Sequence, residues 1–366
     1  MGTKRYHSID IIKGIAMIMI ILCHYGQNYQ IEFVKSFVYL QMGCPIFFVV
    51  SGYGIKCLVD NKYNGKLTKK NIKEFYISRL KALTPGWYIC FVCVILCNSL
   101  ALYFTGKTFS FGRDRRIISI LCNLLYLNGL LPFCNNSVMP GGWYIGTTVV
   151  LYALTPLILY CIRRVTNKSV FLVVSSAIGI VIWGILYFVF PSYFSSSFGY
   201  HFFLIHYPEY ALGIIIGCNR TKISRNISNK LRIVLLLCIA LILAVSMIVF
   251  NMCFSPFNLI IAAWTIALST CFALLLLIPA DDEVGKMYLS VVLGKLGKNC
   301  YFIYLVHGFI VWPFVRVALV LLNRLNIPII LSFWILIPIT IALAYYAGLL
   351  LRMVVGMVNN MLFAPK

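Results

Sequence analysis

Acidic side chains are scarce in this sequence: it has 9 Asp and Glu among 366 residues, against 31 Lys and Arg. Charged residues make up 11% of the chain, whereas hydrophobic residues make up 61%. The chain therefore has more apolar surface than a water-soluble core could bury, which excludes a soluble globular protein. No small-residue cleavage site follows the apolar segment within residues 1–30, so this segment is interpreted as a retained membrane span and not as a signal peptide.

The excess of basic side chains gives a net charge of +22. In a soluble protein this charge would favour binding to nucleic acid, but here Lys and Arg gather in short segments between apolar runs, as the positive-inside rule describes. No nucleic-acid partner is therefore expected. The 14 cysteines lie mostly within apolar runs, and Cys90, Cys93 and Cys97 follow helical spacing without histidine or carboxylate beside them. They indicate helix packing and not a metal site.

Apolar runs of about 20 residues, the length that crosses ~30 Å of hydrocarbon as a helix, recur along the whole chain. We expect ten transmembrane helices, at about 9–28, 36–55, 83–104, 141–161, 169–190, 200–218, 233–254, 257–279, 299–321 and 327–351. The shorter run 117–131 is expected to form an interfacial or re-entrant helix. The predicted fold class is an all-α integral membrane protein, a single domain over residues 1–366, with both termini in the cytoplasm.

The basic residues decide how the run 117–131 is treated. If it crossed the membrane, the group Arg163, Arg164 and Lys168 would lie outside with most later basic segments, against the positive-inside rule. If it does not cross, few of the 31 Lys and Arg lie outside, namely Lys35, Lys107, Arg113, Arg115, Arg116, Arg316 and Arg324.

The largest expected cytoplasmic segment, 56–82, is strongly basic. Its only acidic residues are Asp60 and Glu74, and its basic residues are Lys56, Lys62, Lys66, Lys69, Lys70, Lys73, Arg79 and Lys81. One interpretation is membrane topology together with attraction to anionic lipid headgroups. The other is a docking surface for a phosphorylated donor.

The stretch KGIAMIMIILCH, residues 13–24, places two ionisable groups inside the first expected span. Lys13 and His24 are three helical turns plus about 20° apart, so both project from one face, roughly 16 Å from each other. Asp10 lies one turn before Lys13 and is expected to pair with it. Lys13 either serves a function or simply extends to the membrane interface. His24 either faces a polar cavity, where a neutral imidazole accepts a proton, or is a core histidine bonded to a neighbouring helix.

Further polar groups lie within expected spans. Glu209, in YPEYALG, is mid-span, where an unpaired carboxylate costs on the order of 2.5–3.5 kcal/mol, so a buried Arg or Tyr partner is expected. His307, in YLVHG, fits an acceptor site and a helix–helix hydrogen bond equally well. In FFVVSG, Ser51 and Gly52 allow a neighbouring backbone to approach closely.

Aromatic residues and histidines mark the outer ends of two expected spans. Trp143 and Tyr144 begin the span 141–161 and are interpreted first as an interfacial aromatic belt, with stacking on a sugar face as the alternative. His201 and His206 lie towards the outer boundary of the span 200–218, where a location among lipid headgroups is favoured over catalysis.

Together these segments resemble the acyltransferase 3 family of bacterial membrane acyltransferases. Lys13 and His24 match the family's Arg/Lys-X10-His pattern. The other similar segments cover most of a motif-bearing region of about 8–350: CPIFFVVSGYGI from 44, RLKALTPGWY from 79, GGWYIGTTVVLYALTPLI from 141, YPEYALGIIIG from 207 and LGKLGKNCYFIYLVHGFIV from 293.

The resemblance implies a stand-alone O-acyltransferase of the bacterial plasma membrane, similar to the exopolysaccharide or fucose 4-O-acetylase members. Such a protein moves an acyl group, commonly acetyl, from cytoplasmic acetyl-CoA to a hydroxyl of a cell-surface glycan or its lipid-linked precursor. His24 is then the principal catalytic candidate, and Lys13 helps to handle the donor, although Lys lacks the bidentate fork of Arg. The partners implied are acyl-CoA as a substrate, the glycan or lipid-linked sugar and membrane lipids, with no bound cofactor or metal.

Other site residues follow from the same resemblance. Arg79 and Lys81 are expected to bind the donor. Candidates for acceptor binding or support are Asp10, Ser51, Trp143, Tyr144, Glu209 and His307.

Two positions depart from the family's pattern. Arg79 is kept from an Arg-X-X-Arg element, but its second position is Ala82, with Lys81 as a substitute. Many members carry a glutamate five residues after the tryptophan that Trp143 matches, and here that position is Thr148. A carboxylate that would orient the acceptor is therefore missing, which suggests that His24 works alone or with another acid.

The predicted function is acyl transfer with His24 as general base. The rival prediction is a transporter or polysaccharide-export subunit, in which Lys13, Asp10, Glu209 and the histidines form an ion relay. No internal repeat and no matching pair of Gly/Pro-broken helices is visible in the sequence, which disfavours the transporter.

Overall fold

The computed structural model describes residues 7–106, 117–194, 197–223 and 288–363, with the positions 234, 237, 238 and 241. Over these residues the backbone forms α-helices and short 3-10 helices joined by turns, without a β-strand. The all-α fold class is thereby confirmed for this part of the chain.

The chain packs as two compact units, which are described separately. Unit 1 comprises Met1–Phe47 and Arg220–Lys366, and unit 2 comprises Phe48–Asn219. Because the boundaries fall within α3 (Gly43–Tyr63) and near the end of α10 (Phe203–Ile223), these two helices contribute to both units. The single domain over 1–366 stays a prediction.

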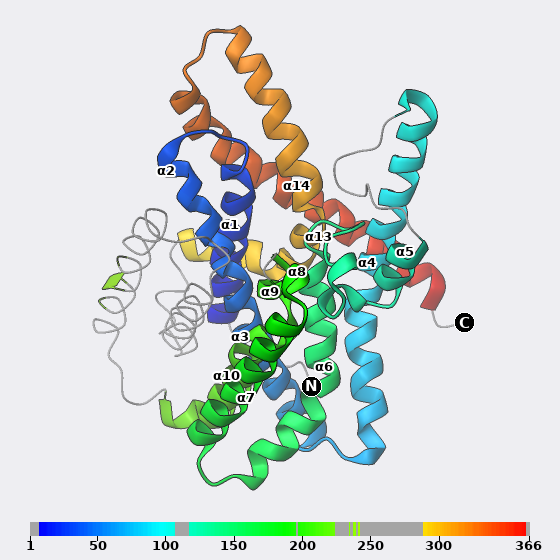
Figure 1. Cartoon of the computed structure of the whole chain (residues 1–366), viewed down its shortest axis with the longest axis vertical. Helices are drawn as coiled ribbons and strands as arrows, with labels where there is room; N and C mark the ends of the chain where they lie inside the picture. The colour runs from blue at the N-terminus through cyan, green and yellow to red at the C-terminus, as the bar shows by residue number, and fades with distance from the viewer. Residues whose placement is uncertain are drawn as a thin grey trace. The chain divides into compact units, whose positions relative to one another are not determined.

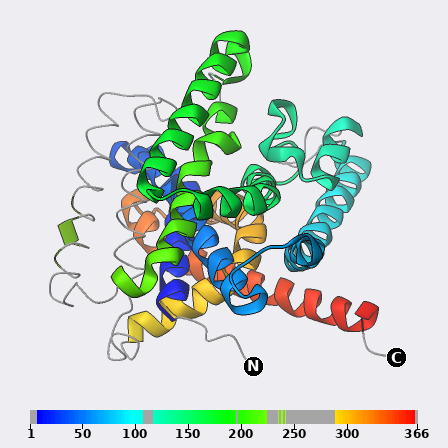
Figure 2. The ribbon, with the colours of Figure 1, turned by 90° about the horizontal axis from the view of Figure 1, so that it is seen from below.

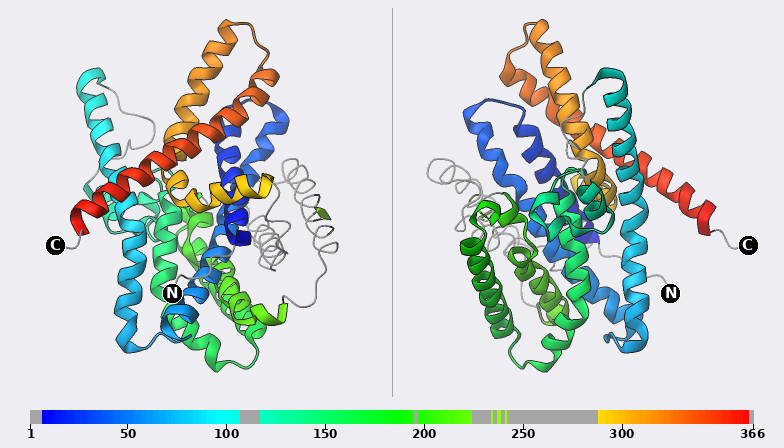
Figure 3. Two further views of the ribbon diagram at one scale, coloured as in Figure 1. Left: turned by 180° about the vertical axis from the view of Figure 1, so that it is seen from behind. Right: turned by 45° about the vertical axis from the view of Figure 1, so that its right-hand side comes forward.

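Unit 1 is built from the two ends of the sequence. Its other helices are α1 (His7–Gly26), α2 (Glu32–Lys35), η1 (Ser36–Met42), α13 (Tyr288–Arg324) and α14 (Ile329–Phe363). α13 and α14 form a helical hairpin (Figure 1), and α1 lies beside α13 (Figure 3, left).

Unit 2 holds the middle of the sequence. Its other helices are α4 (Lys69–Thr105), α5 (Ile117–Leu124), η2 (Leu127–Gly129), η3 (Pro132–Cys134), α6 (Gly142–Arg164), α7 (Lys168–Val189), α8 (Pro191–Phe194), α9 (Ser197–His201) and α10 (Phe203–Ile223). α5 and α6 lie beside α4 (Figure 2), where the Tyr88 hydroxyl donates to Leu124 O over 2.8 Å and the Tyr76 hydroxyl donates to Ala153 O over 2.9 Å.

Seven of the described helical segments are long and apolar enough to cross a membrane: Ile9–Gly26, Phe33–Tyr63, Lys69–Thr105, Gly142–Arg164, Lys168–Val189, Ser290–Arg324 and Ile329–Met361. Each overlaps one of the ten expected spans. Of the other three, 200–218 corresponds to α10, which is not among the seven, whereas 233–254 and 257–279 lie outside the described residues. The count of ten and the cytoplasmic termini stay predictions.

The short run 117–131 contains α5 and η2, and neither is long enough to span a bilayer. α5 exposes the apolar side chains of Ile117 and Leu121, whereas Ser119 and Asn123 are buried. An apolar outer face suits contact with lipid. The structure thus has a short helix at the position where the sequence predicts one.

The basic segment 56–82 is mostly helical, although the sequence suggested a loop. α3 continues to Tyr63, and α4 begins at Lys69. The start of α4 is fixed by a capping box, in which the Thr68 backbone N–H donates to Asn71 Oδ1 over 2.6 Å. The basic residues therefore lie on two helix ends and the turn between them.

Candidate functional site

Two histidines from opposite ends of the sequence meet in unit 1. The ring centroids of His24, near the end of α1, and His307, in α13, are 5.1 Å apart and the rings are tilted by 34°. The Trp312 ring stands edge-on to His24, with centroids 4.9 Å apart. His307 is buried, whereas His24 is partly exposed. The histidine that the sequence singled out thus faces a second imidazole, and we call these two residues the histidine pair.

Hydrogen bonds within each helix orient the histidine pair. His307 Nδ1 lies 2.5 Å from the Tyr304 carbonyl oxygen, which can only accept, so Nδ1 carries the hydrogen. His24 Nδ1 lies 3.4 Å from Gln27 Oε1, a longer contact of the same kind. In a neutral imidazole this arrangement leaves Nε2 with the lone pair. Each ring can therefore accept a proton on the nitrogen that its own helix does not use.

Small residues bring α1 and α13 together. A Cβ atom at Gly14 would overlap the Leu293 carbonyl oxygen, and one at Gly297 would overlap the Asp10 carbonyl oxygen. Gly14 precedes His24 by ten residues, and Gly297 precedes His307 by ten. The two helices therefore run in the same direction from the glycine contact to the histidine pair. In the sequence, this contact corresponds to the segment LGKLG, residues 293–297. That segment supported the family resemblance, but its glycines were not interpreted as a helix contact.

Tyr25, beside His24, ties α1 to α14. Its hydroxyl donates to Phe333 O over 2.6 Å and lies 2.7 Å from the Tyr29 hydroxyl. Tyr25 and Tyr29 are both buried. Hydrogen bonds of this kind hold the end of α1, and with it His24, in one rotation.

Lys13 and Asp10 lie where the helical spacing placed them, on α1 towards its start. Asp10 is buried and Lys13 is partly exposed. Their pairing stays a prediction, as does a contact of Lys13 with a donor.

The expected donor residues lie in unit 2, on α4. Arg79 is partly buried and its Nε donates to Ser78 Oγ over 3.3 Å, while Lys81 is exposed. Nearby, both acidic residues of the basic segment are neutralised: Lys56 Nζ lies 2.5 Å from Asp60 Oδ1, and Lys62 Nζ lies 2.6 Å from Glu74 Oε1. The other lysines of the segment are exposed, namely Lys66, Lys69, Lys70 and Lys73. Their charge is available to an anionic ligand.

A second group of ionisable residues is buried in unit 2, among aromatic rings. Trp143 stacks on His201, with ring centroids 4.1 Å apart, and lies 5.4 Å from the His206 ring. His206 also stacks on Phe48 at 4.7 Å, and Phe48 lies 4.9 Å from Tyr144. No motif or spacing in the sequence predicts that these rings meet, because they come from four helices, α3, α6, α9 and α10.

His206 and Glu209 form a buried pair within this cluster, which we call the His–Glu dyad. His206 Nδ1 lies 3.4 Å from Glu209 Oε1, and both side chains have no exposed surface. The other polar atoms, His206 Nε2 and Glu209 Oε2, have no hydrogen-bond partner among the residues that the structure describes. Unpaired buried atoms are costly, so each is a place where a ligand, a water molecule or a proton would stabilise the protein.

The segment between α5 and α6 supports the cluster through asparagines. Asn135 Nδ2 lies 2.8 Å from His201 Nδ1, and Thr147 Oγ1 donates to His201 O over 3.2 Å. Asn128 Nδ2 donates to Asn123 Oδ1 over 2.9 Å. Burial raises the pKa of Tyr126, so its hydroxyl stays protonated and able to donate a hydrogen bond. This network holds His201 against Trp143.

The structure corrects three expectations about these residues. Trp143 and Tyr144 are buried inside unit 2, so they do not form an exposed aromatic belt. His201 and His206 are buried as well, because aromatic rings and asparagines cover them, and they do not lie among lipid headgroups. The contact found for Glu209 is with His206, one turn earlier, in place of the expected Arg or Tyr.

The motif at Ser51 and Gly52 packs as the sequence predicted. A Cβ atom at Gly52 would overlap the Tyr210 carbonyl oxygen, and one at Gly213 would overlap the Val49 carbonyl oxygen. α3 and α10 therefore approach at backbone distance. Ser51 is partly exposed, and its role in acceptor binding stays a prediction.

Among the described residues, no group of three or more His, Cys, Asp or Glu side chains could hold a metal ion. The cysteines described there form no disulfide bond.

The comparisons with known proteins agree with the sequence-based resemblance. A family model described as an acyltransferase domain matches residues 6–349, nearly the whole chain. No curated protein matches the sequence, and no solved structure matches it.

Proposed function

We propose, from the premise that the chain belongs to the acyltransferase 3 family, that it is an O-acyltransferase of the bacterial plasma membrane. The donor is acyl-CoA, with acetyl as the first candidate, and the acceptor is a hydroxyl of a cell-surface glycan or its lipid-linked precursor. The observation that carries the proposal is the histidine pair, because it sets His24 against a second imidazole whose Nδ1 donates to the Tyr304 carbonyl oxygen.

His24 acts as the general base in this mechanism. It takes the proton from the acceptor hydroxyl while that oxygen attacks the thioester carbonyl carbon, so that a C–O bond forms. The tetrahedral intermediate then collapses, the C–S bond breaks, and the leaving thiolate takes the proton back from the imidazolium. General base catalysis typically contributes 10²–10⁴ in rate. His307 is a positioning residue, since its ring contact limits the rotation of His24.

The donor's phosphates bind basic side chains. Arg79 is suited to this task because a guanidinium grips phosphate oxygens in a bidentate way. Lys81 and the exposed lysines of the basic segment add long-range attraction, and both acidic residues of that segment are already paired. Lys13 extends the basic track along the helix that carries His24.

The aromatic and carboxylate residues of unit 2 are the candidates of that unit for acceptor support. Sugar rings present C–H faces to aromatic side chains and O–H donors to carboxylates. The cluster around Trp143 and Tyr144 offers both, since Glu209 Oε2 has no partner. Thr148 cannot replace the missing family carboxylate, and its hydroxyl donates to Tyr144 O within its own helix over 2.8 Å. Glu209 is the carboxylate of unit 2 that is a candidate for acceptor support once the aromatic cover opens.

The test measures hydrolysis of acetyl-CoA by the purified protein in the absence of acceptor. The quantity measured is the rate at which the CoA thiol is released. His24→Ala should lower the rate by about 10²–10⁴. The matched control is His7→Ala, which removes another histidine of α1 and should keep the rate within about twofold. Unchanged thiol release in His24→Ala would reject the proposed mechanism.

An ion-translocating subunit is the second candidate, and the His–Glu dyad is the observation that favours it. A buried carboxylate next to a buried imidazole, each with one unpaired atom, is what a proton relay would use. Proton flux in vesicles without any requirement for acyl-CoA, abolished by Glu209→Gln, would select this candidate.

A further inference from the structure

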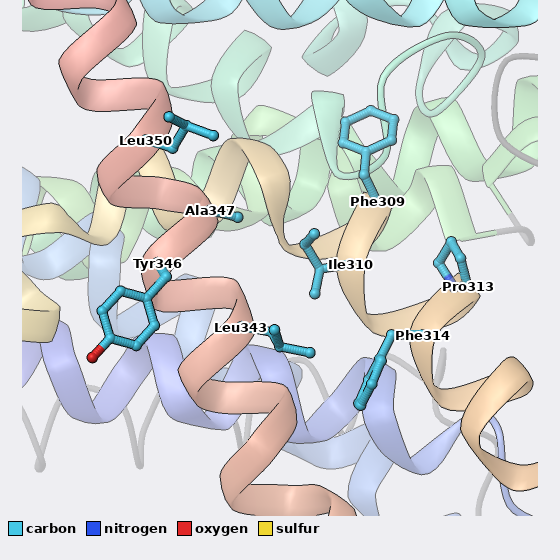
Figure 4. Close-up of a pocket in the computed structure, with 8 residues that line it drawn as sticks. All are labelled: Phe309, Ile310, Pro313, Phe314, Leu343, Tyr346, Ala347 and Leu350. Carbon is cyan, nitrogen blue, oxygen red and sulfur yellow. The ribbon is translucent and has the colours of Figure 1, made fainter.

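A groove of about 500 Å³ opens between α13 and α14 (Figure 4). It is lined by Phe309, Ile310, Pro313, Phe314, Leu343, Tyr346, Ala347 and Leu350. The Tyr346 hydroxyl is the one polar side-chain group of the lining, and Figure 4 shows it pointing away from α13. The volume is within the roughly 300–1,000 Å³ of ligand pockets. A lining of this composition suits a hydrocarbon occupant.

The groove continues as an exposed apolar stripe along α13. Val317 and Val320 follow Ile310 and Pro313 at spacings of three and four residues, which keeps them on one face of the helix. They are 60% and 55% exposed. The same spacing ends at Arg324, the last residue of α13, which is exposed and has no hydrogen bond or ion pair with another described residue. An apolar track therefore leads to a cationic end.

The length and setting of this track fit a lipid. Ile310 and Arg324 are 14 residues apart, which is about 21 Å along a helix and more than half of the ~30 Å hydrocarbon core. Beyond the turn after Arg324, α14 carries Trp334, which is 59% exposed, and tryptophan is typical of the membrane–water interface. The cation thus lies at the interface end of the track and the groove at its deep end.

We infer that this surface binds a lipid phosphate with a single chain, of the polyprenyl type. Its phosphate binds Arg324, and its chain runs along Val320 and Val317 into the groove. We assign the groove one chain because its lining comes from two adjacent helices only, and competition with a two-chain glycerophospholipid tests this assignment. The charge complements a phosphate, which a guanidinium binds more specifically than a neutral headgroup.

The site has a consequence for the acceptor. α13 carries both this track and His307, so a sugar attached to the lipid phosphate would be held on the same helix as the histidine pair. That the sugar is acylated there rests on the proposed function. Binding of the lipid itself does not.

The test uses full-length protein in phosphatidylcholine nanodiscs and a C20 polyprenyl phosphate with a diazirine at the far end of its chain. After illumination, mass spectrometry should find the label in peptides covering 309–314 and 343–350. Arg324→Gln and Ala347→Trp should each lower labelling about tenfold. The matched controls are Arg163→Gln, an exposed arginine at the end of α6, and Val181→Trp on α7, which should both stay within about twofold.

Competition separates a specific site from general lipid contact in the wild-type protein. Unlabelled C20 polyprenyl phosphate should displace the probe, while C20 polyprenol and phosphatidylglycerol should do so at least tenfold less well. Equal competition by either lipid, or equal effects of Arg163→Gln and Arg324→Gln, would overturn the inference. The assay contains no acyl-CoA, so it can succeed when His24-dependent thiol release fails, and the reverse.

Discussion

The histidine pair of unit 1 and the His–Glu dyad of unit 2 place the same kind of side chain in opposite settings. His24 is partly exposed and its Nδ1 contacts Gln27 of its own helix over 3.4 Å. His206 is fully buried, stacked on Phe48 and in contact with a carboxylate that is equally buried. The first imidazole keeps part of its surface exposed, whereas the second is covered on all sides by packed side chains.

The difference separates two tasks. Catalysis needs a base that meets its substrate, which favours the histidine pair. A buried and incompletely paired dyad stores free energy that a ligand or a proton can release. Four predictions probe this division.

The glycine contact between α1 and α13 should give the largest effect. In Gly297→Ala the new Cβ overlaps the Asp10 carbonyl oxygen, so the two helices must separate and the histidine pair with them. Misplacement of a catalytic group by about 1 Å can cost 10²-fold, and acceptor-independent thiol release should fall by about that factor.

Gly356→Ala is the matched control, on α14. A Cβ there has no other atom within 4 Å, so the substitution should raise stability by up to about 1 kcal/mol through helix propensity alone. If both variants release thiol at the wild-type rate, the glycine contact does not position His24.

His307→Gln should have the next largest effect. Glutamine keeps a polar group but lacks the ring that lies 5.1 Å from His24. Because His307 positions the base, kcat for thiol release should fall about tenfold while KM for acetyl-CoA stays within about twofold. A change in KM alone would make His307 a donor-binding residue and remove it from the pair.

Much of the fold and part of the site were predictable from the sequence. Apolar runs predict the spans because hydrocarbon allows little else, and the spacing of Lys13 and His24 predicts one helix face. The meeting of His24 with His307 was not predictable, because it depends on the packing of helices nearly 300 residues apart in sequence. Burial of Trp143 was missed for a related reason: an aromatic residue at the start of a span looks the same whether it faces lipid or a histidine.

The His–Glu dyad should affect stability more than acceptor-independent thiol release. Glu209→Leu leaves His206 buried without its partner, at a cost of about 1–3 kcal/mol. The double variant with His206→Phe replaces both polar groups and should cost less than the sum of the single changes. Thermal unfolding in nanodiscs measures all three. If the loss of unfolding free energy in the double variant equals the sum of the two single losses, His206 and Glu209 do not interact, and the proposed dyad is wrong.

Lys13 should give the smallest effect and the most specific one. It shares α1 with His24 but lies roughly 16 Å away, so removing it should not alter the base. Lys13→Ala should raise KM for acetyl-CoA about fivefold, equivalent to roughly 1 kcal/mol, at constant kcat, because one cation facing the donor's phosphates is lost. Lys13→Arg should restore KM, since a guanidinium binds phosphate at least as well as an ammonium. If Lys13→Ala lowers kcat and leaves KM unchanged, the Lys13 charge contributes to the chemical step. Donor binding at the start of α1 and catalysis at its end would then not be separate tasks.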